Sequence, residues 1–386
     1  MRRLAWSVLP LVTLLVAACT FDQRAIGVPP AQLVVHSVLN ESEFEQEVLV
    51  ERTLTGSVFI ADTRRFDPLD PINTGGGVPV TRATVTIAGP DGTFTGTELN
   101  YQGFPSQYGA GRYVVRMQVQ AGARYILTVR ASDGGIVTGS TVVPRTTALP
   151  LFAPELSFRR DRDTLTVSWA PVPLARAFGL RVDSPFGAFV LFTDSTHSSL
   201  PGDIRNVFAS DLQHLFIPGF RQDYTVFAVD TNYFDYYRSR NDPFTGSGII
   251  NRLAGGIGVF GSVALLRSGA VDVTQSPVDP SIEGDYEIAQ GPAQAIPYID
   301  VMRLYVETPG ATHASLSGWY SRNRRLSIRD GIAGTRDGTR IELTLLVNQD
   351  AHQHLATFVG TQVGDSLVGN YAGLTGRVVL RRRVVP

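Results

Sequence analysis

The amino-acid sequence predicts an all-β protein made of two β-sandwiches followed by a small antiparallel β-barrel. Three observations support this prediction. The 386 residues include 38 glycines and 23 prolines, which suits a chain with many turns. Short runs rich in Val, Thr and Tyr alternate apolar and polar residues, as half-buried strands do. From residue 282 onward, turn signals recur about every 8–12 residues, which is typical of an antiparallel meander.

The first nineteen residues have the layout of a secretory signal peptide. Two arginines precede an apolar run over residues 4–16, and two alanines precede Cys19. The apolar run is shorter than the about 20 residues of a membrane-spanning helix, and Pro10 interrupts it. We therefore expect residues 1–18 to be removed after export.

The sequence Val-Ala-Ala-Cys at residues 16–19 resembles the lipobox of bacterial lipoproteins. In that family the signal is cleaved before the cysteine, the thiol receives a diacylglycerol and the new amino group is acylated, as with palmitate. Cys19 is the only cysteine of the chain, which strengthens the match. The resemblance implies a lipid anchor on Cys19. The next residue is Thr20, not the aspartate that retains lipoproteins in the inner membrane, so the resemblance favours the outer membrane and leaves the face open.

Composition limits the domain count and the partners. Without its signal the chain has room for two to three domains of roughly 100–200 residues each. The net charge of the whole chain is −1, so there is no basic excess to hold a nucleic acid, and none is expected as a partner. With its only cysteine lipidated the chain can form no disulfide, and each domain depends on its own apolar core.

Residues 19–30 are predicted to form a short tether, and residues 31–145 the first sandwich. A strand over residues 83–87 alternates Ala, Val and Ile with Thr and is closed by the turn at residues 89–92. A second strand, with its apolar residues at Tyr125, Leu127 and Val129, precedes an Asp-Gly-Gly hairpin turn.

Three segments of this region resemble the Ig-like and transthyretin-like domains of surface proteins. They are residues 79–87, 111–113 and 122–127. In such proteins the domain is usually a spacer or a docking module.

A Pro- and Thr-rich stretch over residues 144–154 is predicted to be a linker, and residues 150–274 a fibronectin type III-like β-domain. Leu165, Val167 and Trp169 share one face of a strand. Trp169 followed by Ala-Pro-Val-Pro resembles the second strand of a fibronectin type III sandwich, whose tryptophan is a packing residue.

Residues 230–261 contain the most distinctive pattern after the signal: a Tyr- and Phe-rich run ending in Arg238, and the sequence Gly-Gly-Ile-Gly-Val-Phe-Gly at residues 255–261. Together with the lipobox and the first domain, residues 17–270 resemble an uncharacterised family of bacterial outer-membrane lipoproteins with an Ig-like N-terminal domain. Its members are often found beside TonB-dependent receptors. The resemblance implies a location, and an outer-membrane receptor or other envelope protein as partner, rather than a reaction.

A second linker is predicted at residues 276–280, followed by the antiparallel barrel over residues 281–386. Apolar residues alternate with polar ones at 302–307 and again at 341–347. About eight strands would close an up-and-down barrel, similar in outline to lipocalins and avidin. Because Leu, Ile and Val supply its inward faces, we expect the interior to be filled with side chains rather than to hold a ligand.

Three motifs with known chemistry match by residue type alone. Residues 256–261 fit the Gly-x-Gly-x-x-Gly dinucleotide fingerprint, but no helix pattern or βαβ context follows. His352 and His354 would share a strand face, but no third metal ligand is evident nearby. Residues 194–197 contain Asp, Ser and His as neighbours in one loop, whereas triads assemble from distant segments. We therefore expect no enzymatic activity, no cofactor and no metal.

One cluster of side chains is a candidate binding site. Aromatic rings beside a planar cation can stack on sugars or anchor a protein partner. The alternative is a buried seam between domains or part of a core, and the sequence leaves both open. The cluster comprises Tyr233, Phe234, Tyr236, Tyr237, Arg238 and Phe244.

The function expected from these observations is that of a non-catalytic binding or accessory module of the cell envelope, working with an outer-membrane receptor. The alternative is a structural or adhesive surface protein in which the sandwiches are spacers.

Overall fold

The chain is built almost entirely from β-strands, with one described α-helix, and the predicted fold class is confirmed. Within the described residues, no helix is long and apolar enough to span a membrane. The computed structural model describes residues 31–53, 78–99, 110–184, 187–202, 215–239, 250–291, 301–308, 313–321, 330–347, 350–373 and 375–383. Cys19 and Phe244 lie outside these residues.

The first sandwich packs a four-stranded sheet against one half of an eleven-stranded sheet. The four-stranded sheet has the order β5 (Gly92–Thr95), β4 (Thr84–Gly89), β8 (Arg124–Arg130) and β9 (Ile136–Val142). The facing half consists of β17 (Ile257–Thr274), β1 (Leu33–Asn40), β2 (Glu45–Arg52), β7 (Arg112–Arg116) and β6 (Thr97–Glu98), with β3 (Val78–Pro79) beside β2. The alternation read from the sequence places Val85, Ile87 and Leu127 in the core between the two sheets.

The second sandwich uses the other half of the same large sheet. Its strands are β14 (Gly187–Thr193), β13 (Ala177–Ser184), β16 (Arg221–Val229), β17, and the edge strands β10 (Leu151–Phe152) and β11 (Leu156–Arg159). A two-stranded sheet of β12 (Thr164–Ser168) and β15 (His197–Pro201) covers it. Leu165 and Val167 point into this core, as their alternation predicts.

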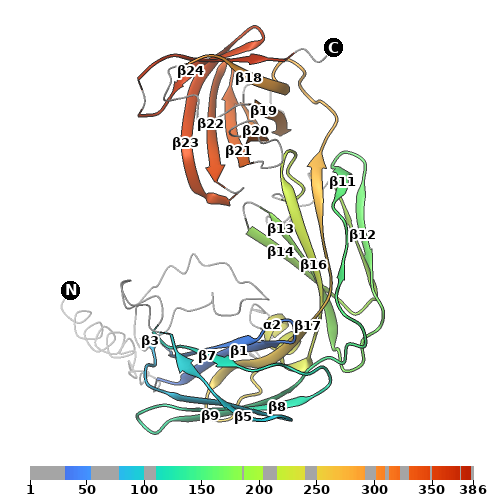
Figure 1. Ribbon diagram of the computed structural model, residues 1–386, viewed down its shortest axis with the longest axis vertical. Helices are drawn as coiled ribbons and strands as arrows, with labels where there is room; N and C mark the ends of the chain where they lie inside the picture. Colours follow the sequence, from blue (N-terminus) through green and yellow to red (C-terminus); the bar gives the residue numbers. More distant parts are fainter. Residues whose placement is uncertain are drawn as a thin grey trace, which may run out of the picture.

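Strand β17 belongs to both sandwiches and joins them into one body. Its first residues pair in parallel with β1, from Val34 opposite Ile257 to Asn40 opposite Val263. Its later residues pair with β16 on one side and with β10 and β11 on the other. Figure 1 shows β17 running from the lower sandwich into the upper one. The boundary between the two sandwiches therefore lies across a continuous strand.

Gly258, within the glycine pattern of residues 255–261, has a structural explanation in β17. Its φ of +121° is one that side-chain-bearing residues rarely adopt. A Cβ at this position would lie 2.1 Å from the carbonyl oxygen of Val35. The glycine lets β17 approach β1 closely, in an all-β setting rather than a dinucleotide fold.

The C-terminal module is a closed barrel of eight antiparallel strands, as predicted. Its inward side chains, including Met302, Leu343 and Phe358, form one buried cluster. In the described part of the barrel this interior is therefore filled with side chains. The strands are β18 (Gly284–Gln290), β19 (Val301–Thr308), β20 (His313–Ser321), β21 (Asp330–Asp337), β22 (Arg340–Val347), β23 (Asp350–Val363), β24 (Ser366–Tyr371) and β25 (Val378–Arg382).

The barrel is packed directly against the second sandwich. Ile217 and Phe220, from the segment that leads into β16, form a buried apolar cluster with Leu346 of the barrel. The stretch at residues 276–280, predicted as a linker, is hydrogen-bonded as well: the Glu283 carboxylate accepts bonds from the backbone N–H groups of residues 278 and 279. The three modules follow a curved path with the barrel at one end (Figure 1).

Candidate partner-binding groove

Four large apolar side chains lie exposed within one short stretch of the second sandwich. Leu149 is 92% exposed, Phe152 74%, Leu151 55% and Leu156 46%. Two of them, Leu151 and Phe152, form the short strand β10. One edge of β10 is hydrogen-bonded to β17, and its other edge is paired with no strand among the described residues. Single exposed apolar residues are common on soluble proteins, whereas a contiguous group marks an interaction site.

Leu149 and Leu151 line a groove of about 210 Å³, here called the β10 groove, and Phe152 and Leu156 follow them in the sequence. The groove is formed by residues 145–149, by Leu151, by residues 168–172 and by Leu266 and Arg267 of β17. The walls are largely apolar, and among the described residues that line them Trp169 is the only aromatic one. The groove therefore combines three segments that are distant in the sequence.

Local sequence explains why this edge stays open. Pro150 and Pro154 flank β10, and because proline has no backbone N–H, they limit the strand to two residues and blunt its edge. Trp169 lies just beyond β12 and packs partly against the core, with its ring 5.6 Å from that of Phe178. Trp169 therefore has the predicted packing role and also lines the groove.

The charged groups of the β10 groove are arginines, and its other polar side chains are the hydroxyls of Thr146, Thr147 and Ser168. Arg145 and Arg267 line it, and no acidic residue in the described part of the chain does. Two nitrogen atoms, the indole Nε1 of Trp169 and Nε of Arg267, are buried and have no hydrogen-bond partner among the described residues. Buried polar groups are nearly always hydrogen-bonded, so two such donors at one groove require an explanation.

The aromatic cluster predicted from the sequence lies elsewhere, on helix α2 (Thr231–Ser239), in the bend between the two sandwiches (Figure 1). Tyr233 and Tyr236 are buried in a cluster that joins Val38 of the first sandwich to Val229 of the second. These two side chains therefore offer no surface to a partner in this structure, and their position is that of a seam between domains.

The rest of the aromatic cluster is only partly buried. The rings of Tyr237 and Phe192 lie 4.5 Å apart, and Arg176 lies 5.0 Å from the ring centre of Phe234. Arg238 donates a hydrogen bond to Asp235 at 2.9 Å. Phe244 lies outside the described residues, so the structure brings together five of the six predicted side chains.

Two carboxylates fix the position of α2, and Asp235 is the first. Burial disfavours its charge, but hydrogen bonds from Arg252 and Arg238 outweigh burial and hold the pKa of Asp235 below its usual value. The bond from Arg252 connects the helix to the segment before β17, and the bond from Arg238 lies within the helix.

Asp230 is the second carboxylate; it precedes the first turn of α2 and is 4% exposed. It accepts hydrogen bonds from the backbone N–H groups of Tyr233 (2.9 Å) and Ser262 (3.2 Å) and from the Thr141 hydroxyl. Burial raises the pKa of Asp230 to about 6, and the hydrogen bonds offset only part of the rise. Because its partners belong to β9, α2 and β17, Asp230 ties the helix to both sheets of the first sandwich.

Comparison of the sequence with known protein families identifies a family to which no activity is assigned. Residues 20–265 match the model of a domain of unknown function (DUF4249). The chain belongs to the DUF4249 family. No curated protein matches the chain.

Three solved structures with low similarity cover most of the chain. A Ca²⁺-stabilised adhesin of an Antarctic bacterium that binds ice is 12% identical, with 93% of this chain and 75% of the other covered and a TM-score of 0.16. The FN1–FN3 domains of chicken CNTN1 are 8% identical, with 92% and 99% covered and a TM-score of 0.16. Another bacterial ice-binding adhesin is 11% identical, with 92% and 96% covered and a TM-score of 0.15. Likeness at this level does not bear on function.

The DUF4249 match includes α2 and the groove residues up to Val172, and it ends within β17 at residue 265, just before the groove residues Leu266 and Arg267. The sequence shows the apolar residues of the groove, because Leu149, Leu151 and Phe152 interrupt a stretch otherwise rich in Pro and Thr. The prediction of a linker over residues 144–154 depends on the prolines and threonines of this stretch and not on its apolar residues.

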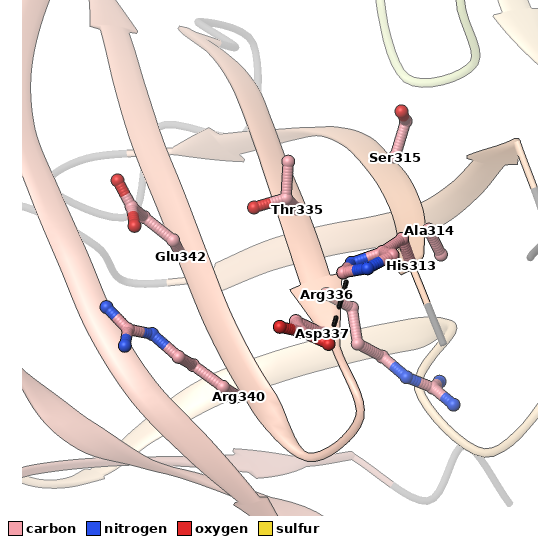
Figure 2. A pocket seen from close by; sticks show the side chains of 8 residues that line it. All are labelled: His313, Ala314, Ser315, Thr335, Arg336, Asp337, Arg340 and Glu342. Atoms are coloured by element: carbon pink, nitrogen blue, oxygen red, sulfur yellow. Dashed lines mark ion pairs between the residues drawn. The ribbon is translucent and has the colours of Figure 1, made fainter. Parts of the chain in front are cut away.

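A second concavity lies on the outer wall of the barrel, outside the DUF4249 match. It has a volume of about 420 Å³ and is formed by β20, β21 and β22. Figure 2 shows its side chains: His313 lies 3.5 Å from Asp337, and Arg340 and Glu342 extend from the neighbouring strand. Arginines and carboxylates occur here in equal number, and none of the described residues that line the concavity is a large apolar one. The β10 groove, with exposed apolar anchors and unpaired donors, is the stronger candidate.

Proposed function

We propose that this DUF4249 protein is a lipid-anchored, non-catalytic binding module of the outer membrane. Its β10 groove holds a protein partner, and the expected partner is an outer-membrane receptor. The observation that carries the proposal is the group of exposed apolar side chains at residues 149–156, of which Leu149 and Leu151 line the groove. Interfaces of this kind combine apolar anchors with a polar rim.

The size of the β10 groove favours a protein over a small molecule. Pockets for drug-sized ligands or cofactors have volumes of about 300–1,000 Å³ and bury most of the ligand. The groove measures about 210 Å³, and its apolar residues extend onto the open surface beside it. Such a site accommodates one or two anchoring side chains of a larger partner.

A non-catalytic role agrees with the structural roles of two carboxylates that have altered pKa values. Asp230 and Asp235 have altered pKa values because of burial and hydrogen bonds that hold α2 in place. Their partners are backbone groups, a hydroxyl and arginines of the fold itself. These carboxylates therefore act in stability.

Replacing Leu149 and Phe152 together by serine is expected to abolish receptor capture. Both side chains are mainly exposed, so their loss removes interface contacts at little cost to folding. Hot-spot residues contribute about 2 kcal/mol or more, so affinity should fall by about 30-fold or more. The measurement is affinity purification of the lipidated protein from solubilised outer membranes, with the receptor quantified by mass spectrometry.

The matched control is a serine replacement of Ile126 and Ile136, which are also exposed apolar residues but lie on β8 and β9. This variant should retain the receptor. Equal capture by both double variants would contradict the proposed role of the β10 groove.

The continuous strand β17 favours a second candidate function, that of a structural or adhesive spacer. A strand of 18 residues that is hydrogen-bonded in two sandwiches resists bending between them. On this account the protein holds its barrel at a fixed distance from the membrane, and groove variants would leave function unchanged.

A further inference from the structure

We propose that the segment bound by the β10 groove is an extended polypeptide stretch in which a carboxylate side chain lies between apolar residues. The inference rests on the proposed function and specifies the chemistry of the partner. It follows from three features of the groove: its charge, its unpaired donors and the direction of its apolar edge.

The charge of the β10 groove selects an anion. Arg145 and Arg267 line it without an acidic residue among the described lining residues. The carboxylate nearest in the hydrogen-bond network is that of Glu41, which accepts bonds from the Thr146 hydroxyl at 2.9 and 3.0 Å and does not line the groove. Burial raises the pKa of Glu41, and the hydrogen bond from Thr146 offsets part of the rise. A ligand carboxylate would thus meet two guanidinium groups.

The unpaired donors select an acceptor. The indole Nε1–H of Trp169 can only donate a hydrogen bond, and so can the Nε–H of Arg267. Both atoms are buried and have no partner within the described parts of the chain. Arginine binds carboxylates through two parallel bonds, and such charge-assisted bonds are stronger than neutral ones. A carboxylate or a backbone carbonyl in the groove would reach these donors once the side chains of Trp169 and Arg267 turn towards it.

The apolar edge selects a polypeptide. Leu151 and Phe152 form the edge strand β10, and Leu149 lies two residues before it, so the three exposed side chains follow one another along this edge. An extended peptide presents side chains at matching intervals, with apolar residues on both sides of the carboxylate. A fatty acid also combines a carboxylate with an apolar chain, but it needs an enclosed apolar channel, and these side chains are exposed.

The test uses the full mature chain and three matched sets of fluorescein-labelled ten-residue peptides. Within each set apolar residues flank one position, which is Asp in the first set, Asn in the second and Lys in the third. Fluorescence anisotropy should show binding of the Asp set, with dissociation constants about tenfold lower than those of the Asn set, and no binding of the Lys set. Replacing Arg145 and Arg267 together by Gln should lower the affinity for the Asp peptides to that for the Asn peptides.

Arg267 is half-buried on β17, so Arg267→Lys serves as a second variant that keeps the charge but lacks the planar fork. This variant should bind the Asp peptides more weakly than the wild type and should keep the same melting temperature. The inference would be overturned if the Asp and Asn peptides bound equally well, or if no peptide set bound. It would also be overturned if palmitate displaced the Asp peptides. Loss of the receptor from the Leu149/Phe152 variant together with equal peptide binding would leave the proposed function standing and reject only the carboxylate chemistry.

Discussion

Replacing Cys19 by serine is expected to release the protein from the membrane fraction. The lipobox resemblance assigns acyl chains to Cys19, and each buried methylene contributes about 0.8 kcal/mol to membrane binding. A serine cannot form the thioether to diacylglycerol, so the whole anchor is lost. Separating soluble and membrane fractions by ultracentrifugation should show nearly all of the wild type in the pellet and nearly all of the variant in the supernatant.

Thr20→Ser is the matched control for this experiment, because it changes the neighbouring residue by one methyl group and leaves Cys19 in place. It should remain membrane-bound. A Cys19→Ser protein that still sediments with membranes after a high-salt wash would reject the lipid anchor, and with it the location proposed for this chain.

Asp230→Asn is expected to stabilise the protein at pH 8. The pKa of Asp230 is raised from 3.8 to about 6, which corresponds to about 3 kcal/mol in favour of its neutral form. An asparagine supplies a neutral side chain of the same shape. Its oxygen can accept the two backbone N–H bonds, and its amide can donate to Thr141, whose hydroxyl lies 3.1 Å from that of Ser262. A gain of about 1–3 kcal/mol in the free energy of unfolding should result.

The direction of the predicted change in stability follows from how the protonation of Asp230 depends on pH. Between pH 4 and pH 6 the native protein holds a proton on Asp230 that the unfolded chain has released, so the contribution of Asp230 to stability is lost as pH rises through about 6. Urea unfolding at several pH values should therefore show the advantage of Asp230→Asn shrinking from pH 8 towards pH 4. Asp223→Asn, at a mainly exposed carboxylate, is the control and should change little. An Asp230→Asn variant less stable than wild type at pH 8 would contradict the account of the seam.

The barrel and most strands could be predicted from the sequence because their signals are local. Apolar residues at every second position identify β4, β8, β12 and β22, and the turn residues between them favour antiparallel neighbours. The shared strand β17 could not be predicted in this way. Its parallel pairing with β1 joins residues more than two hundred positions apart, and no local pattern specifies such a partner.

Helix α2 was missed because Tyr, Phe and Thr favour strands, whereas buried contacts with both sandwiches stabilise a helix here. Two signals indicate it in retrospect: Asp230 is a preferred residue at a helix start, and Tyr233, Tyr236 and Tyr237 have i, i+3, i+4 spacing. The β10 groove needed the structure, because its walls come from three segments that only the sheet brings together.

The most direct test of the central claim is photo-crosslinking in intact cells of the native host. A photoreactive amino acid is placed at position 149 or 152 of the full chain, with position 126 on the first sandwich as the control. We predict an adduct with an outer-membrane receptor from positions 149 and 152 and none from position 126. Absence of any adduct at positions 149 and 152, or the same adducts at all three positions, would contradict a partner-binding role for the β10 groove.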